Sequence, residues 1–288
     1  MHPIQNNVRL AKFSSYQIGG PADFLVEVDS AEEVMEATAW AEERDLPVFV
    51  LGGGTNLLFD DAGFRGLVIV MKADLVEVRG ETVWAEAGAK MARVVQAAEM
   101  AGLSGLEPWC GLPGTVGGAV RGNAGCFGLE TAHVLLNAHV FVQGEGVVEW
   151  HAEDFHYAYR HSVLKERWGV VLDATFQLKQ NDVEAVRERG RAIAKLRMQK
   201  QPPGLSTGSF FKNPSVDQPA GWLIEQCGLK GFQVGGAKVS DHHANFLLNA
   251  GGASSVDFRE LAKTVQSKVK ERFGIELEPE IVFVPSQA

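Results

Sequence analysis

Two glycine-rich stretches in this 288-residue chain have the composition of loops that bind phosphate groups. The first is 51–58, LGGGTNLL, and the second is 111–128, GLPGTVGGAVRGNAGCFG. Glycines as dense as those of the second stretch are too costly for a packed helix or strand, because each loses backbone entropy and buries no side chain. A backbone without Cβ atoms turns its N–H groups toward an anion and approaches phosphate oxygens closely. We therefore predict two loops that hold the two phosphates of a dinucleotide.

Neither stretch matches the common nucleotide-binding motifs. The first lacks the Gly-Lys-Ser/Thr ending of a P-loop, and Leu57 stands where a Rossmann fingerprint has its third glycine. Each stretch taken alone also fits an ordinary turn. Amide and hydroxyl residues stand beside the glycines in both, Thr55 and Asn56 in the first and Thr115 and Asn123 in the second, and they favour a binding site of a different kind.

Three residues outside these stretches have side chains suited to proton transfer or charge stabilisation. They are Ser209 in TGSFFKNP, Arg160 in YAYRHS and Glu280 in LEPEI. Each also fits an ordinary structural role, as a turn serine, a stacked or ion-paired arginine and a solvated glutamate. The adjacent pair His242 and His243 points different ways on regular structure and has no third ligand at a suitable spacing, so we expect no metal site.

The composition narrows the class of protein. The net charge of -9 without a cluster of Lys or Arg argues against a nucleic-acid partner. No apolar run of about 18 residues and no apolar segment near the first residue is present, so we expect no membrane insertion and no signal peptide. The three cysteines, Cys110, Cys126 and Cys227, are odd in number and form no Cys-x-x-Cys, which suits the cytoplasm. We infer no obligate protein partner.

The elements that must position these residues form an α+β pattern. Alternating or apolar segments predict strands at 23–28, 47–51, 66–71, 75–78, 82–87, 134–143, 147–150, 169–178, 232–234, 244–248 and 281–284. Helices are predicted at 31–44, 91–101, 183–199, 220–227 and 257–273. Pro202 and Pro203 forbid continuation of the helix before them, so a domain boundary is expected after residue 199.

These motifs together resemble the UDP-N-acetylenolpyruvoylglucosamine reductases, the MurB family of flavoenzymes in bacterial peptidoglycan precursor synthesis. The resemblance runs through both glycine stretches and Tyr159-Arg160, and through the blocks YQIGGPAD, GSFFKNP, AGWLIEQC and LEPE, in that family's order. It implies an FAD-binding fold of the vanillyl-alcohol-oxidase (PCMH) type. Its two lobes would be residues 1–72 and 73–199, and residues 200–288 would form a smaller C-terminal α+β substrate-binding domain.

The resemblance also implies the reaction and its participants. Non-covalent FAD would be the cofactor and NADPH the co-substrate, and UDP-N-acetylglucosamine enolpyruvate would be reduced to UDP-N-acetylmuramate. Cell-wall synthesis would tie the activity to cell shape and cell division. Hydride would reach C3, and Ser209 would give a proton to C2, while Arg160 and Glu280 polarise the substrate. Because a bare carboxylate repels the charge that develops, we expect surroundings that raise the pKa of Glu280.

Further residues carry over as contacts. Those implied for FAD are Gly52, Gly53, Gly54, Thr55, Asn56, Leu57, Leu58, Gly111, Pro113, Gly114, Thr115, Gly117, Gly118, Asn123, Ala124 and Gly125. Those implied for the substrate are Lys200, Asn213 and Lys230.

The chain departs from the family pattern in three places. It lacks room between Arg160 and Ser209 for the inserted loop whose tyrosine covers the substrate, so it resembles the branch without that loop. His161 stands where aspartate is common, and Val282 stands where some relatives have an arginine near the flavin. Two alternatives stay open: an oxidase or dehydrogenase of the same FAD fold with another substrate, and a non-catalytic protein that binds a nucleotide-sugar.

Overall fold

The computed structural model describes residues 1–286 and forms two compact units, each assembled from segments that are distant in the sequence. Unit 1 consists of Met1–Ile4, Val26–Gly53 and Val68–Arg197. Unit 2 consists of Gln5–Leu25, Gly54–Leu67 and the chain from Met198 onward. The division into 1–72, 73–199 and 200–288 stays a prediction. Within residues 1–286, no helix is both long enough and apolar enough to cross a membrane.

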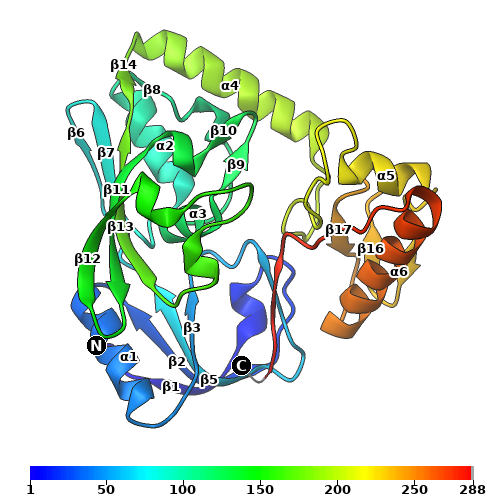
Figure 1. Ribbon diagram of the computed structural model, residues 1–288, viewed down its shortest axis with the longest axis horizontal. Helices are drawn as coiled ribbons and strands as arrows, with labels where there is room; N and C mark the ends of the chain where they lie inside the picture. The colour runs from blue at the N-terminus through cyan, green and yellow to red at the C-terminus, as the bar shows by residue number, and fades with distance from the viewer. Residues whose placement is uncertain (287–288) are drawn as a thin grey trace. The chain divides into compact units, whose positions relative to one another are not determined.

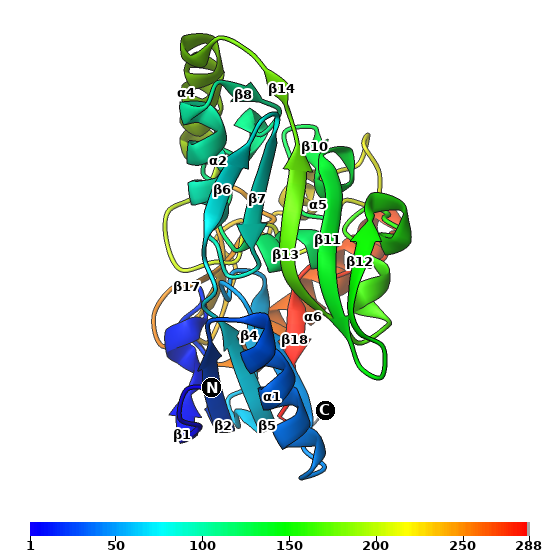
Figure 2. The same cartoon turned by 90° about the vertical axis from the view of Figure 1, so that its left-hand side faces the viewer.

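A five-stranded antiparallel sheet is the centre of unit 1, with the strand order β12-β11-β13-β7-β6 (Figure 2). These strands are β6 (Val76–Arg79), β7 (Thr82–Glu86), β11 (Leu135–Val142), β12 (Gly146–His151) and β13 (Val170–Gln177). Their inward residues alternate with exposed or half-buried ones, so Val83, Ala85, Ala138, Val140 and Phe176 are fully buried. The sequence predicted all five strands, β6 and β7 from their period of two.

A second sheet has the order β1-β2-β5-β3. Its strands are β1 (Gln5–Arg9), β2 (Pro21–Val28), β3 (Val48–Leu51) and β5 (Phe64–Met71). The sequence did not predict β1, which pairs with β2 through registers such as Gln5 with Leu25. As an edge strand, β1 is almost entirely exposed and therefore has no apolar alternation to detect.

Unit 2 carries a three-stranded sheet, β15-β16-β17, and the parallel pair β4–β18. The strands are β4 (Leu57–Phe59), β15 (Gln233–Val234), β16 (Ala237–Val239), β17 (Leu247–Asn249) and β18 (Val282–Val284). Helix α6 (Ser255–Phe273) is the longest helix of this part of the described chain (Figure 1). It begins at a capping box of Ser254 and Asp257, and Phe258 and Leu261 on its apolar face are fully buried. The sequence predicted β15, β17 and β18 but not the three-residue strands β4 and β16.

The remaining elements are helices, two-residue strands and single turns of 3-10 helix. The other helices are α1 (Ala31–Glu42), α2 (Met91–Met100), α3 (Val116–Gly122), α4 (Val183–Lys200) and α5 (Ala220–Gln226). The other strands are β8 (Leu103–Ser104), β9 (Gly125–Cys126), β10 (Leu129–Glu130) and β14 (Lys179–Gln180). Single turns of 3-10 helix lie at Leu10–Phe13, Glu107–Trp109, Thr131–His133, Ala152–Phe155 and Val163–Lys165. The mixture of helices and strands confirms the α+β class.

The expectation that the glycines of 111–128 are too dense for a helix is wrong for α3. Tertiary packing explains this helix: a Cβ atom on Gly117 would lie 3.0 Å from the Cβ of Ala87, so the missing side chain lets α3 approach the neighbouring segment. The helix ends where Asn123 adopts the left-handed conformation, with φ at +46°.

Candidate active site

The first glycine stretch begins at the end of β3. Gly52 and Gly53 belong to unit 1, and the next residues, through β4, belong to unit 2. Gly54 has φ at +63°, and a Cβ atom there would lie 1.7 Å from the carbonyl oxygen of Phe13. The Ser15 N–H also donates to the Gly54 carbonyl at 3.0 Å. Only glycine fits this position, whatever the loop binds. Leu57 and Leu58 are buried in β4, and Thr55 and Asn56 lie between them and Gly54.

The second stretch is joined to the segment before α2 by backbone hydrogen bonds within unit 1. The Met91 N–H donates to the Gly114 carbonyl at 3.1 Å, and the Gly117 N–H donates to the Ala87 carbonyl at 2.9 Å. The Gly117 N–H is therefore already used inside the protein. Any role of Gly117 in binding comes from the close approach that a missing side chain permits. Gly111, at φ +75°, and Gly114, at φ +108°, make the turns that deliver α3; Pro113 and Gly118 lie in the same stretch.

Thr115 provides the clearest sign of a ligand in unit 1. Its hydroxyl is buried and has no hydrogen-bond partner among residues 1–286, a property shared only with the Trp109 indole nitrogen in that range. A Cβ atom on Gly52 would lie 2.4 Å from this hydroxyl. The Thr115 side chain of the second stretch therefore lies against the bare backbone of Gly52 in the first stretch. Because an unpaired buried hydroxyl costs about 1–3 kcal/mol, a ligand oxygen is its natural partner. This cradle fits a phosphate-bearing cofactor such as FAD.

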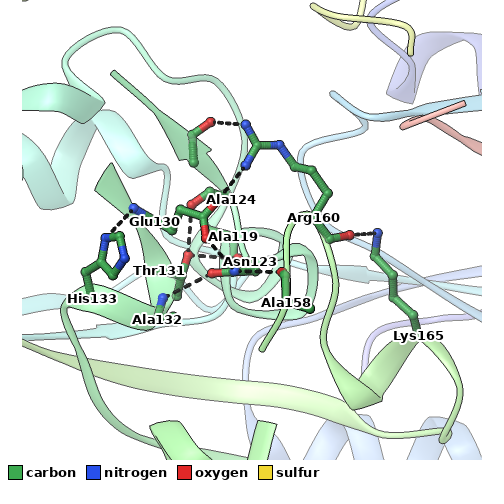
Figure 3. Close-up of polar contacts among 11 residues, drawn as sticks. Ala119, Asn123, Ala124, Glu130, Thr131, Ala132, His133, Ala158, Arg160 and Lys165 are labelled. Atoms are coloured by element: carbon green, nitrogen blue, oxygen red, sulfur yellow. Dashed lines mark hydrogen bonds and ion pairs between the residues drawn. The ribbon is translucent and has the colours of Figure 1, made fainter. Parts of the chain in front are cut away.

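Asn123 is buried, and both the nitrogen and the oxygen of its side-chain amide form hydrogen bonds within unit 1 (Figure 3). Its Nδ2 donates to Glu130 Oε2 at 3.0 Å and to the Ala158 carbonyl at 2.9 Å. Its Oδ1 accepts from the Ala132 N–H at 3.1 Å. The neighbouring Ala124 carbonyl accepts from the Thr131 N–H at 3.0 Å. Asn123 thus supports the β9–β10 hairpin and the turn that carries Arg160.

Arg160 lies in a tight turn from Ala158 to His161, closed by two backbone hydrogen bonds of 3.0 and 3.2 Å between those residues. Its guanidinium donates to Glu130 Oε1 at 3.2 Å and to the Gly125 carbonyl at 2.6 Å (Figure 3). Lys165 Nζ donates to the Arg160 carbonyl at 2.7 Å. Both the backbone and the side chain of Arg160 are therefore held within unit 1.

Ser209 and Glu280 lie on adjacent segments of unit 2. The Glu280 N–H donates to the carbonyl of Phe210, the residue after Ser209, at 2.8 Å. Asn56 Nδ2 donates to the Glu280 carbonyl at 3.2 Å, which joins the first glycine stretch to the same place. Phe210 is fully buried and anchors the serine loop. The structure thus brings together two of the three predicted catalytic residues in unit 2, while Arg160 belongs to unit 1.

The three predicted substrate contacts also lie in unit 2. Lys230 Nζ pairs with Glu225 Oε1 at 2.7 Å. Asn213 Oδ1 accepts from the Ala220 N–H at 3.0 Å and so caps the start of α5. Lys200 is the exposed last residue of α4. Lys230 is therefore an ion-paired cation, the Asn213 amide is used in part for capping, and Lys200 is an exposed cation.

His161 and Val282, the two residues that differ from the family pattern, have local partners. His161 Nε2 lies 3.4 Å from Glu166 Oε1. Val282 pairs with Leu57 in the parallel β4–β18 ladder, and its N–H donates to the Asn56 carbonyl at 3.0 Å. Val282 therefore supports the first glycine stretch through its backbone.

Two residues that hold the candidate site were missed in the sequence. Glu130 receives the Arg160 guanidinium, and Asn245 exchanges two hydrogen bonds with the backbone of Phe211, at 3.0 and 2.8 Å. Neither shows a sequence signal, because their partners lie 30 and 34 residues away. Burial raises the pKa of the Cys126 thiol, which lowers its fraction of reactive thiolate.

Two family models match the chain. Residues 199–284 match the C-terminal domain of UDP-N-acetylenolpyruvoylglucosamine reductase, and residues 22–150 match an FAD binding domain. The chain is 46% identical over 275 residues to the UDP-N-acetylenolpyruvoylglucosamine reductase of Rubrobacter xylanophilus, covering 94% of this chain and 92% of that protein. It is 43% identical over 282 residues to the reductase of the same name from Chloroflexus aurantiacus, covering 94% of each.

Solved structures agree with these matches. The crystal structure of UDP-N-acetylenolpyruvylglucosamine reductase (MurB) from Thermus caldophilus has a TM-score of 0.87 at 36% identity and covers 99% of this chain and 100% of that chain. A berberine bridge enzyme variant, 19% identical with a TM-score of 0.50, covers 62% of this chain and 39% of that chain and is similar in fold alone. The predicted FAD-binding fold of the vanillyl-alcohol-oxidase type is confirmed. With these relatives aligned over nearly its whole length, the chain belongs to the UDP-N-acetylenolpyruvoylglucosamine reductase (MurB) family of FAD-dependent oxidoreductases.

Proposed function

We propose that this chain reduces UDP-N-acetylglucosamine enolpyruvate to UDP-N-acetylmuramate with NADPH, in peptidoglycan precursor synthesis in the cytoplasm. The observation that carries the proposal is the hydrogen-bonded placement of the Ser209 and Glu280 segments side by side in unit 2. It occurs in a chain whose relatives, at 46% and 43% identity, are named for this reduction.

The proposed FAD site uses the two glycine stretches. When bound there, FAD would supply a two-electron carrier between NADPH and C3 of the enolpyruvyl ether. Thr115 would donate its otherwise unpaired hydroxyl to a phosphate oxygen, and Gly52 would leave room for that oxygen beside it. The remaining cofactor contacts are those that the family resemblance assigns.

Arg160 is proposed to stabilise the charge that develops on the substrate. Hydride arriving at C3 pushes electrons toward a carboxylate that is already negative, which forms an enolate-like dianion. A guanidinium held in place before the reaction stabilises that charge without reorganising. Glu280 assists only as a protonated or hydrogen-bonded carboxyl, and a raised pKa of its side chain stays a prediction.

Ser209 is proposed to donate the proton to C2 that completes the lactyl group. Its loop is anchored by the buried Phe210, and the backbone of the next residue is held by Asn245, so the hydroxyl is presented from a rigid segment. Lys230, Asn213 and Lys200 are proposed to contact the UDP part. Because Lys230 is paired with Glu225, the diphosphate has to share or displace that carboxylate.

The test follows NADPH oxidation by the purified flavoprotein with and without the enol ether. We expect NADPH consumption to depend on the enol ether. Ser209→Ala should leave flavin reduction by NADPH within about twofold and slow reduction of the enol ether by at least about 100-fold. The control is Ser215→Ala, since the Ser215 hydroxyl accepts a local turn bond from the Gln218 N–H.

Two results would contradict the proposal. A flavoprotein that oxidises NADPH at the same rate without the enol ether would mean that another substrate is used. Near-normal turnover in Ser209→Ala would reject Ser209 as the proton donor.

A further inference from the structure

The backbone at Arg160 is unusual for an arginine. It has φ at +56° in the second central position of a two-residue turn, where glycine or asparagine is normally found. The left-handed conformation costs a residue with a Cβ atom about 1–2 kcal/mol. Such strain persists where surrounding contacts hold the residue, and here Lys165 and the turn bonds do so.

The guanidinium rests in a seat built from two groups. We call the Glu130 carboxylate and the Gly125 carbonyl the arginine seat, which takes two of the five N–H donors of the guanidinium (Figure 3). A Cβ atom on Gly125 would lie 2.7 Å from Arg160 Nη1 and 2.8 Å from Glu130 Cγ. The bare backbone at Gly125 is therefore needed for the seat itself.

Glu130 is in turn held by other residues. Its Oε2 accepts from Asn123 Nδ2 at 3.0 Å, and its side chain also accepts from the backbone N–H of His133 in a capping box. The Glu130 N–H donates back to His133 Nδ1 at 3.2 Å. Because Asn123 is only 1% exposed and bonded on both sides of its amide, the carboxylate has one defined position.

We propose that Glu130 is a positioning residue that affects enol-ether reduction only through Arg160. This inference rests on the proposed role of Arg160 in charge stabilisation. An arginine side chain carries about 2 kcal/mol of rotamer entropy, and the seat removes that freedom before the substrate arrives. The guanidinium then meets the developing charge from a fixed position.

The test is a double-mutant cycle on the FAD-loaded protein with Glu130→Gln, Arg160→Ala and both together. The glutamine is isosteric with glutamate, but its NH2 group cannot accept from Asn123 or Arg160, so one of those bonds is lost. Flavin reduction by NADPH and reoxidation by the enol ether are followed separately by flavin absorbance. Thermal midpoints are recorded for every variant, and Glu130→Asp, which keeps the charge and shortens the reach, is the second seat variant.

We expect both seat variants to slow reoxidation by about 10- to 100-fold, as misplacement of a reacting group does, with flavin reduction within about twofold. In the Arg160→Ala background, Glu130→Gln should cause no further slowing. The control is Glu145→Gln, which breaks an exposed ion pair with Arg167 and should change neither half-reaction.

Three results would overturn the inference. Normal reoxidation in both seat variants beside a slow Arg160→Ala would reject the role of Glu130 and leave the proposed function intact. Equal slowing by Glu130→Gln in both backgrounds would show that Glu130 acts independently of Arg160. Normal reoxidation in Arg160→Ala would reject both this inference and the proposed role of Arg160.

Discussion

Gly52→Ala tests whether the two glycine stretches meet as the structure shows. The new Cβ atom would lie 2.4 Å from the Thr115 hydroxyl oxygen, which is a severe steric clash. Gly52 does not have a positive φ, so alanine brings no backbone strain there and the effect is purely steric. Thr115 is 7% exposed and has little room to move. Overpacking of this kind costs about 1–3 kcal/mol.

The structure also predicts which second substitution relieves the clash. In Thr115→Ala the hydroxyl and methyl groups are gone, and the closest atom of residue 115 to the new side chain is Cβ at 3.6 Å, an ordinary contact. Gly52→Ala/Thr115→Ala should therefore be about as stable as Thr115→Ala alone. The matched control is Thr115→Val, which keeps a carbon atom in place of the oxygen and should give no relief to Gly52→Ala.

The assay is the thermal midpoint of the FAD-free protein for the three single variants and the two double variants. A loss of 1–3 kcal/mol lowers the midpoint of Gly52→Ala by about 2–12 °C. An unchanged midpoint in Gly52→Ala would refute the close approach of the two stretches. A Gly52→Ala/Thr115→Ala protein no more stable than Gly52→Ala would show that the hydroxyl is not the group that clashes.

Four further outcomes follow from the site. Thr115→Val alone should weaken FAD binding by about tenfold without lowering the stability of the FAD-free protein, because it removes a hydroxyl with no partner in residues 1–286. Flavin titration measures the affinity and thermal melting measures the stability. An unchanged affinity for FAD would contradict a role of Thr115 in binding. Lys230→Ala should raise the KM for the UDP-sugar and leave flavin reduction unchanged, and an equal loss in flavin reduction would place Lys230 elsewhere. Glu280→Gln should slow reoxidation by the enol ether in single-turnover experiments, and an unchanged rate would remove Glu280 from the mechanism. Burial alone would raise the pKa of Glu107, but hydrogen bonds from backbone amides, Ser104 and Arg189 outweigh burial and lower that pKa below the usual 4.5. The Glu107 carboxylate therefore stabilises the fold above about pH 4.5, and this stabilisation is lost as the pH falls through the lower pKa of the folded protein. Glu107→Gln should make the loss of stability with falling pH shallower, and identical acid-unfolding curves for the two proteins would contradict this.

The local elements were largely predictable from the sequence. Strands with a buried face, such as β7 and β13, alternate with period two, and long amphipathic helices such as α6 combine an apolar face with a capping box at Ser254. Elements that are stabilised mainly by packing against neighbouring segments were not predicted or were predicted wrongly. The edge strand β1 has nothing to bury, and α3 is helical because Gly117 packs closely on Ala87.

The candidate site, too, was predictable from the sequence only in part. The glycines, Ser209, Arg160 and Glu280 were identified from residue type, motif and family resemblance, since the chemistry of phosphate binding and proton transfer restricts which residues can serve. No sequence signal indicated that the Phe13 carbonyl leaves room only for glycine at position 54, or that Glu130 holds Arg160.

The sequence by itself determined the class of fold, the family and the set of residues able to do the chemistry, because periodicity, composition and motif are properties of the chain read in order. Only the tertiary structure decided that Glu130 and Gly125 seat Arg160, that Thr115 faces Gly52, and that Ser209 lies beside the Glu280 segment. Those pairs are separated by between 30 and about 70 residues, and a contact over such a distance is set by how the sheets and helices pack, which no local pattern records.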